Sequence, residues 1–99
     1  MDRVRQEGRR VRTEYIDVRT LVSPLSYPRV GIVVPRFQQT IVERNRLRRR
    51  LRELVRTRLL PFIPPQDVLL RAGPRAYGKP FAVLESEIRS IAGALARES

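Results

Sequence analysis

TIVERNRLRRRLRELVRTRLL, residues 40–60, is a stretch with helical periodicity. At about 100° per residue, four apolar side chains fall on one side of a helix: Leu47, Leu51, Leu54 and Val55. The opposite side carries Asn45, Arg49, Arg52 and Arg56, with Arg46 and Arg50 along one edge and Arg44 and Arg48 along the other. The stretch therefore predicts an amphipathic helix that turns leucines toward a core and an arginine face away from it.

Both ends of this helix carry capping signals. Thr40 and Glu43 form a capping-box pair, in which the threonine hydroxyl accepts the Glu43 N–H and the carboxylate accepts the Thr40 N–H. Arg56 and Arg58 suit the negative end of the helix dipole, and Pro61 stops the helix. We expect the helix to run from about residue 41 to 58.

The positive charge of the chain is concentrated near this helix. The 99 residues include 21 basic and 10 acidic side chains, a net charge of +11, and Lys79 is the only lysine. Residues 40–60 hold eight arginines and two glutamates, and residues 1–12 hold five arginines and two acidic residues. A GC-rich genome also favours arginine over lysine. Arginines concentrated in two segments are nevertheless what a nucleic-acid site predicts, because the planar guanidinium group pairs with phosphate.

The composition also excludes several classes of site. The chain has no cysteine and no histidine, which removes disulfides, thiolate nucleophiles, zinc sites and imidazole catalysis. Asp67 and Glu43 are explained more simply by a turn and a cap than as metal ligands, so we expect no metal bound by the protein. With no membrane-length apolar run and no signal-peptide core, we expect a cytoplasmic protein that does not bind membranes.

The rest of the chain predicts strands on both sides of the basic helix. Residues 1–10 have the pattern of the last turns of a helix that stops at Gly8. Residues 11–22 alternate with period two, and residues 29–35, RVGIVVP, predict a buried central strand. Residues 67–71 predict a further strand.

A second amphipathic helix closes the chain. Pro80 suits its first turn, and its apolar stripe consists of Phe81, Leu84, Ile88, Ile91 and Leu95. We expect Phe81 and Phe37 to lie in the core. The order of elements predicts one small α+β domain over residues 1–99, with helices packed on a sheet.

Residues 29–54, RVGIVVPRFQQTIVERNRLRRRLREL, resemble the signature region of the bacterial ribonuclease P protein component. That family has a strand Arg-Leu-Gly-Ile-x-Val, a short basic link, and a helix Ala-Val-x-Arg-Asn-Arg-x-Lys-Arg-x-x-Arg-Glu. The matching positions are Arg29, Gly31, Ile32, Val34, Val42, Arg44, Asn45, Arg46, Arg49, Arg52 and Glu53, with Arg48 in place of the lysine. Weaker echoes extend over nearly the whole chain.

This resemblance implies a two-layer α/β sandwich in the order α-β-β-β-α-β-α. Its sheet would be mixed and the Arg-Asn-Arg helix would lie in a crossover, as in the second domain of a small-subunit ribosomal protein. It implies a ribonuclease P subunit that binds the catalytic RNA and the 5′ leader of precursor tRNA. Cleavage of the leader, which matures the tRNA 5′ end, would belong to that RNA with Mg²⁺, and the protein would supply no catalytic residue.

The chain departs from the family pattern at a few positions. The family's N-terminal helix begins about ten residues earlier, so we expect that helix to be truncated here. Gln39 stands at a frequent glycine, Arg19 at a commonly aromatic position, and Pro35 at a small polar one. These departures concern leader stacking more than binding of the RNA subunit.

The expected sites follow from the helix and the resemblance together. The residues expected to bind the RNA subunit are Arg44, Asn45, Arg46, Arg48, Arg49, Arg52 and Arg56. Weaker candidates for the leader are Tyr15, Arg19, Arg9, Arg10, Arg12 and Arg36. For Tyr15 and Arg19, which alternation predicts to be exposed, a cross-strand pair is the simpler explanation. On the arginine face, Glu53 is expected to pair with Arg49 and Arg56.

Two other functions remain open at this point. A ribosomal or other structural protein could bind RNA through the same helix with no role in processing. A DNA-binding helix in the major groove is disfavoured, because arginines surround too much of the helix and no dimer signal accompanies it. We expect a monomer in a 1:1 complex with RNA.

Overall fold

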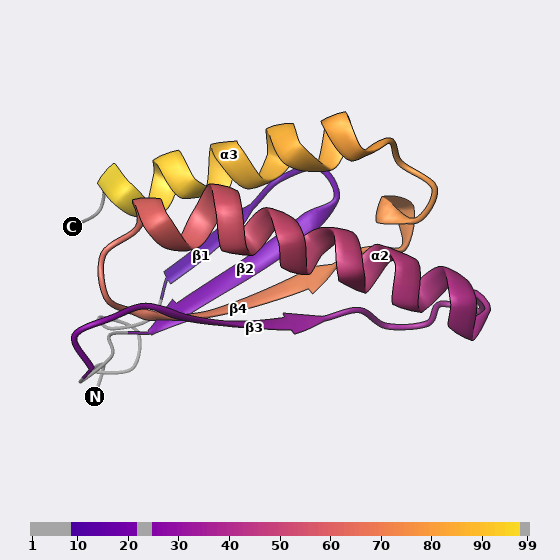
Figure 1. Ribbon diagram of the computed structural model, residues 1–99, viewed down its shortest axis with the longest axis horizontal. Helices are drawn as coiled ribbons and strands as arrows, with labels where there is room; N and C mark the ends of the chain where they lie inside the picture. Colours follow the sequence, from indigo (N-terminus) through magenta and orange to yellow (C-terminus); the bar gives the residue numbers. More distant parts are fainter. Residues whose placement is uncertain (1–8, 22–24, 98–99) are drawn as a thin grey trace.

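The computed structural model describes residues 9–21 and 25–97. Its strands are β1 (Arg9–Arg12), β2 (Ile16–Leu21), β3 (Arg29–Val33) and β4 (Asp67–Ala72), and its α-helices are α2 (Ile41–Leu54) and α3 (Phe81–Arg97). Figure 1 shows this order along the chain. The helix end expected within residues 1–8 lies outside the described residues.

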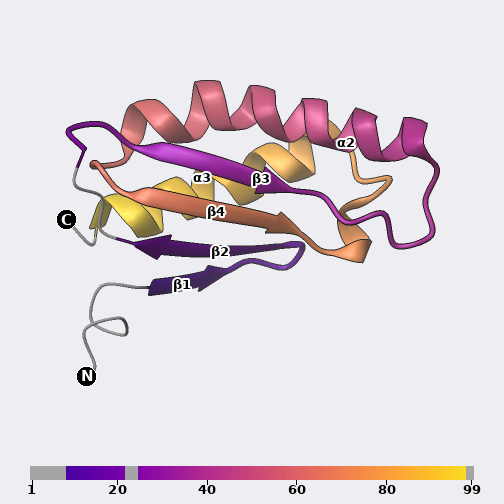
Figure 2. The same cartoon turned by 90° about the horizontal axis from the view of Figure 1, so that it is seen from below.

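The strands form one mixed sheet in the order β1-β2-β4-β3. The β1–β2 and β2–β4 pairs are antiparallel, whereas β3 and β4 are parallel and are joined by a crossover that contains α2. Both helices lie on one face of this sheet (Figures 1 and 2). The small α+β sandwich and the crossover position of the Arg-Asn-Arg helix are confirmed.

Three strands precede α2, as the resemblance implied, and one strand prediction was wrong. The alternating stretch divides between β1 and β2, because Thr13 N donates to Ile16 O at 2.9 Å and turns the chain into a hairpin. Arg9 and Arg10, which were included in the predicted helix end, begin β1. β3 is an edge strand, not a central one, because β4 comes between it and β2. Val30 and Ile32 are accordingly only half-buried, although their run is β-branched.

The core lies between the sheet and the two helices. The leucine stripe is confirmed, since Leu47, Leu51, Leu54 and Val55 are each at most 4% exposed. From α3, buried side chains come from Leu84, Ile88, Ile91 and Leu95, and from β2 they come from Ile16, Val18 and Thr20. Thus one face of β2 and one stripe of each helix exclude water together.

The predictions that Phe81 and Phe37 lie in the core were wrong. Phe81 is 42% exposed, because it is the first residue of α3 and precedes the buried stripe by one turn. The Phe81 ring lies beside α2. Phe37 is 38% exposed and has a φ of 48°, and Gln38 follows with a φ of 66°. Two consecutive left-handed residues are uncommon without glycine, and here they turn the chain from β3 toward α2.

The start of α2 matches the capping prediction in part. Thr40 Oγ1 accepts the Glu43 N–H at 3.1 Å, while the Glu43 carboxylate lies 3.6 Å from Arg46. After Leu54 the helix continues as a π-helical turn, Val55–Leu59, and a 3-10 turn, Leu60–Phe62. The wider turn brings both Val55 and Leu59 against the core. Among the described residues no helix is long and apolar enough to cross a membrane.

Candidate nucleic-acid interface

The arginines of α2 are distributed around the helix according to its periodicity. Asn45, Arg46, Arg49, Arg52 and Arg56 are exposed, and they follow one another on the side away from the leucine stripe. Arg44, Arg48, Arg50 and Arg58 are half-buried at the edges of that side. The predicted arginine face is thus present on a helix anchored by its leucines.

Arg44 donates a hydrogen bond to the segment that precedes α2. Its Nε donates to the carbonyl oxygen of Val34 at 2.7 Å, in a partly buried position. Val34 directly follows β3, so this bond ties the end of the strand to the first turn of α2. Arg44 was predicted to bind RNA, and the structure gives it a contact that supports the fold.

Acidic side chains engage some of the remaining arginines. Arg56 pairs with Glu53 at 2.7 Å and Arg58 with Glu85 at 2.8 Å, whereas Arg50 reaches the Lys79 carbonyl at 3.5 Å. Glu53 was also expected to pair with Arg49, but in the described part of the chain its carboxylate pairs with Arg56 and not with Arg49. The hydrogen bond from Arg58 holds the pKa of Glu85 below its usual value, so this carboxylate stays charged against the helix.

Three arginines and one asparagine of α2 have no partner among the residues that the structure describes. Within residues 9–21 and 25–97, the side chains of Asn45, Arg48, Arg49 and Arg52 have no hydrogen bond or ion pair. Each guanidinium offers five N–H donors and no acceptor, and Asn45 adds an amide with both. These four residues form the open part of the arginine face, which can receive a polyanion without breaking existing bonds.

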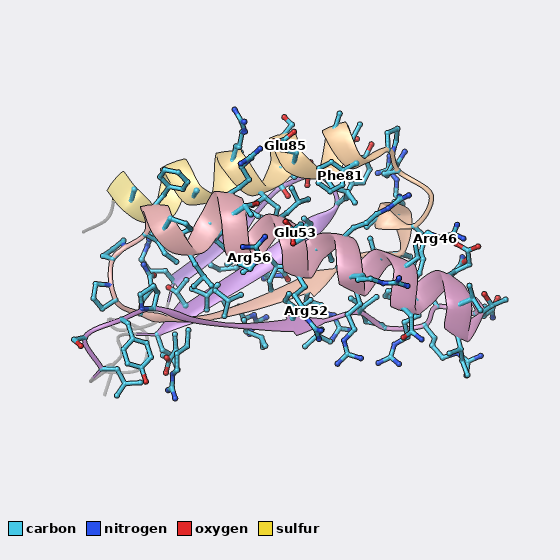
Figure 3. The ribbon with its side chains drawn as sticks, viewed as in Figure 1. Arg46, Arg52, Glu53, Arg56, Phe81 and Glu85 are labelled. Carbon is cyan, nitrogen blue, oxygen red and sulfur yellow. The ribbon has the colours of Figure 1, made fainter. Side chains whose placement is uncertain are left out.

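Two grooves flank the arginine face. A groove of about 380 Å³ between α2 and β3 is lined by Val30, Ile32, Arg48, Arg52, Val55, Arg56 and Leu60. A groove of about 680 Å³ between α2 and α3, here called the α2/α3 groove, is lined by Val42, Arg46, Arg49, Arg50, Arg52, Glu53, Arg56 and Phe81. Figure 3 shows Arg46, Arg52, Glu53 and Arg56 along α2 and Phe81 at the start of α3.

On the other face of the sheet, two arginines are paired with aspartates on neighbouring strands. Arg10 on β1 donates two hydrogen bonds to Asp17 on β2, at 3.0 and 2.9 Å, and Arg29 on β3 donates two to Asp67 on β4, both at 2.9 Å. The bonds from Arg10 lower the pKa of the Asp17 carboxyl. These cross-strand pairs were not predicted, because they depend on strand register.

The predicted leader-binding residues fall into separate places. Arg9, Arg10 and Arg19 line an open groove of about 1040 Å³ on the sheet, together with Leu21 and Leu69. Arg12 and Tyr15 line a smaller hollow of about 230 Å³ that also includes Phe37. Arg36 donates to the Gln39 carbonyl at 3.3 Å in the link before α2. The structure therefore brings three of the six candidates into one groove and places two at another.

Tyr15 is less accessible than alternation predicted. It is half-buried and packs against the core, and Arg75 and Lys79 lie over its ring at 5.3 and 4.7 Å from the centroid. Its backbone N–H donates to Glu87 on α3 at 3.0 Å, so the hairpin is fastened to the helix layer. The ring is thus already in contact with two cations of the same chain.

Sequence reasoning missed two features of these surfaces. Arg71 is exposed on the same sheet face as Asp17, its register partner, and period-two alternation with Leu70 could have identified it. The exposure of Phe81 had no clear signal, because its spacing from Leu84 fits an apolar stripe. Among the described residues, no group of three or more acidic side chains could hold a metal ion.

Comparisons with known proteins agree with this architecture. The sequence profile of the family described as Ribonuclease P matches residues 1–96. The ribonuclease P protein component of Acidothermus cellulolyticus is 38% identical over 94 residues, which cover 93% of this chain and 78% of that protein. The component from Mycobacterium ulcerans is 40% identical over 65 residues, which cover 66% of this chain and 54% of that protein.

Solved structures show the same fold. The RNase P protein of Thermotoga maritima superposes with a TM-score of 0.75 at 26% identity, covering 95% of this chain and 86% of that one. The RNase P protein of Staphylococcus aureus gives a TM-score of 0.76 at 21% identity, covering 95% and 89%. With a fold, an arginine helix and a nearly full-length profile match in agreement, the chain belongs to the ribonuclease P protein component family.

Proposed function

We propose that this chain is the accessory protein subunit of ribonuclease P, which binds the RNA subunit through the arginine face of α2. The observation that carries the proposal is a set of polar side chains on one side of that helix that have no partner in the described part of the chain, Asn45, Arg48, Arg49 and Arg52. In this role the RNA cleaves precursor tRNA with Mg²⁺ in the cytoplasm, and the protein contributes binding alone.

The physical basis is electrostatic and geometric. Each arginine that neutralises a phosphate releases condensed counterions, which favours binding strongly at low salt. Arg49 and Arg52 project from successive turns of a helix whose other side is fixed by Leu47, Leu51 and Leu54. Because the backbone is already ordered, RNA binding costs mainly the freedom of the side chains.

The open sheet groove supports a second contact of the same complex. Arg19 is exposed there with no hydrogen bond or ion pair inside the described part of the chain, and Leu21 and Leu69 are each 49% exposed beside it. A guanidinium group beside an apolar surface suits a single-stranded nucleic-acid segment. We assign this groove to the 5′ leader of precursor tRNA, in a complex of one protein and one RNA subunit.

The test is cleavage of precursor tRNA by a family RNA subunit at low Mg²⁺ concentration, with and without this chain. The expected result is a clear rise in kcat/KM when the chain is added, and loss of that rise in Arg49→Ala/Arg52→Ala. No stimulation by the wild-type chain, despite tight RNA binding, would leave a structural RNA-binding role as the better account.

A further inference from the structure

The α2/α3 groove holds a feature that the arginine face alone does not explain. Phe81 opens α3 with 42% of its surface exposed, although a phenyl ring gains from burial. It lies beside the middle turns of α2 (Figure 3), and the groove that it lines also contains Arg46, Arg49 and Arg50. An accessible aromatic ring thus stands within a row of guanidinium groups.

The ring of Phe81 differs from that of Tyr15 in what covers it. Two cations of the same chain lie over Tyr15, as described above. No cation lies over Phe81 among the residues that the structure places, even though five arginines line its groove. The exposed surface of Phe81 is therefore open to a group from another molecule.

The charges around the groove favour a polyanion. Its lining contains five arginines and one glutamate, Glu53, whose carboxylate is already bonded to Arg56. The arginines recur on successive turns of α2, at a rise of about 5.4 Å per turn. A repeated row of cations beside an aromatic ring is the arrangement that follows a nucleic-acid backbone and stacks its bases.

We propose that the α2/α3 groove binds an unpaired nucleotide of the RNA partner, with its base stacked on Phe81 and its flanking phosphates held by Arg46, Arg49 and Arg50. This inference rests on the proposed function and adds a site to it. The nucleotide is single-stranded, because a base within a duplex offers no free face to the ring. An acidic protein segment would satisfy the arginines but would leave the ring without a planar partner.

The experiment compares Phe81→Leu and Phe81→Tyr in the full chain for binding to a family ribonuclease P RNA. We expect Phe81→Leu to weaken binding about 5- to 30-fold, the effect of losing one stacked base, and Phe81→Tyr to bind within about twofold of wild type. The slope of log affinity against log salt should not change in either variant, because no charge is removed. Phe62→Leu is the matched control, since Phe62 is 60% exposed and does not line the groove.

A second readout detects the stack itself. A six-nucleotide oligoadenylate with 2-aminopurine at its centre should lose fluorescence on binding to the wild-type chain and to Phe81→Tyr, and should lose much less on binding to Phe81→Leu. Thermal unfolding of each variant checks that the fold is kept.

The outcomes separate this inference from the proposed function. Equal RNA affinity and equal quenching for Phe81→Leu and wild type would overturn the stacking site and leave the RNA-binding helix intact. If the wild-type chain failed to bind the RNA but bound polyglutamate, both the proposed function and the stacking site would fail.

Discussion

The arginine face of α2 and the open face of the sheet differ in how their charges are satisfied. On the sheet, Arg10 and Arg29 each donate two hydrogen bonds to an aspartate on the neighbouring strand. On α2, Arg48, Arg49 and Arg52 have no such partner within the described residues. Exposed arginines with no hydrogen bond or ion pair in the described part of the chain also occur on the sheet, but those of α2 lie together on successive turns of one helix side, and this arrangement favours a polyanion.

A leucine buried behind the arginine face and a leucine exposed on the open sheet face give the largest expected contrast. Leu51→Ala should lower the free energy of unfolding by about 2–5 kcal/mol, because Leu51 is fully buried beneath the arginine face. Leu69→Ala, on the sheet face where Leu69 is 49% exposed, should cost about 1 kcal/mol or less. Urea unfolding measures both, and equal losses would mean that α2 is not held by its leucine stripe.

Arg44 and Arg48 divide the arginines of α2 into a structural and a binding class. Arg44→Ala should destabilise the fold by roughly 1.5–3 kcal/mol, because it removes the charged donor to the Val34 carbonyl. Arg48→Ala removes no intramolecular bond that the structure describes, and it should leave the unfolding midpoint nearly unchanged while weakening RNA binding. The reverse pattern would show that the Arg44 bond is not maintained in solution.

Much of α2 could be predicted from sequence, because its information is local. Periodicity identified the leucine stripe, and Thr40 and Glu43 marked the first turn. The edge position of β3 could not be predicted, since the same β-branched run suits a central or an edge strand. Strand order depends on which partner pairs with β4, and periodicity carries no information on that.

For the candidate site, too, local features could be predicted and contacts between distant segments could not. The exposed side of α2 followed from its spacing, but the bond of Arg44 to Val34 and the Arg10–Asp17 pair required strand positions and register. Phe81 was wrongly predicted to lie in the core, because the spacing of apolar residues does not show where a helix extends beyond the core that it packs on. The exposed side of a helix could thus be predicted from the sequence, whereas contacts between distant segments could not.

The cap at the start of the arginine helix should have an intermediate effect. Thr40→Ala should cost about 1 kcal/mol, because the Glu43 N–H loses its acceptor. Thr57→Ala is the matched control, since its hydroxyl donates to the Glu53 carbonyl late in the helix and caps nothing. Thermal unfolding compares the two, and a loss at Thr57 equal to that at Thr40 would argue against the cap.

Loss of the Arg10–Asp17 pair in acid should have the smallest effect on the free energy of unfolding. The pKa of Asp17 is lowered from its ordinary 3.8 by the hydrogen bond from Arg10, so the pair stabilises the fold above that pH. This stabilisation is lost as the pH falls below 3.8 and through the lower pKa that Asp17 has in the folded protein. Asp17→Asn should therefore reduce stability near neutral pH and narrow the difference from wild type in acid. A constant difference across that range would contradict the assigned shift.

The most direct measurement is the salt dependence of binding to a family ribonuclease P RNA for two double variants that remove the same charge. Arg49→Ala/Arg52→Ala should flatten the log–log slope by about 1.4 to 1.8, since each phosphate contact contributes roughly 0.7 to 0.9. Arg10→Ala/Arg29→Ala, tested without precursor tRNA, should leave the slope unchanged. An unaltered slope for the first variant, or equal flattening by both, would contradict the assignment of the RNA interface to α2.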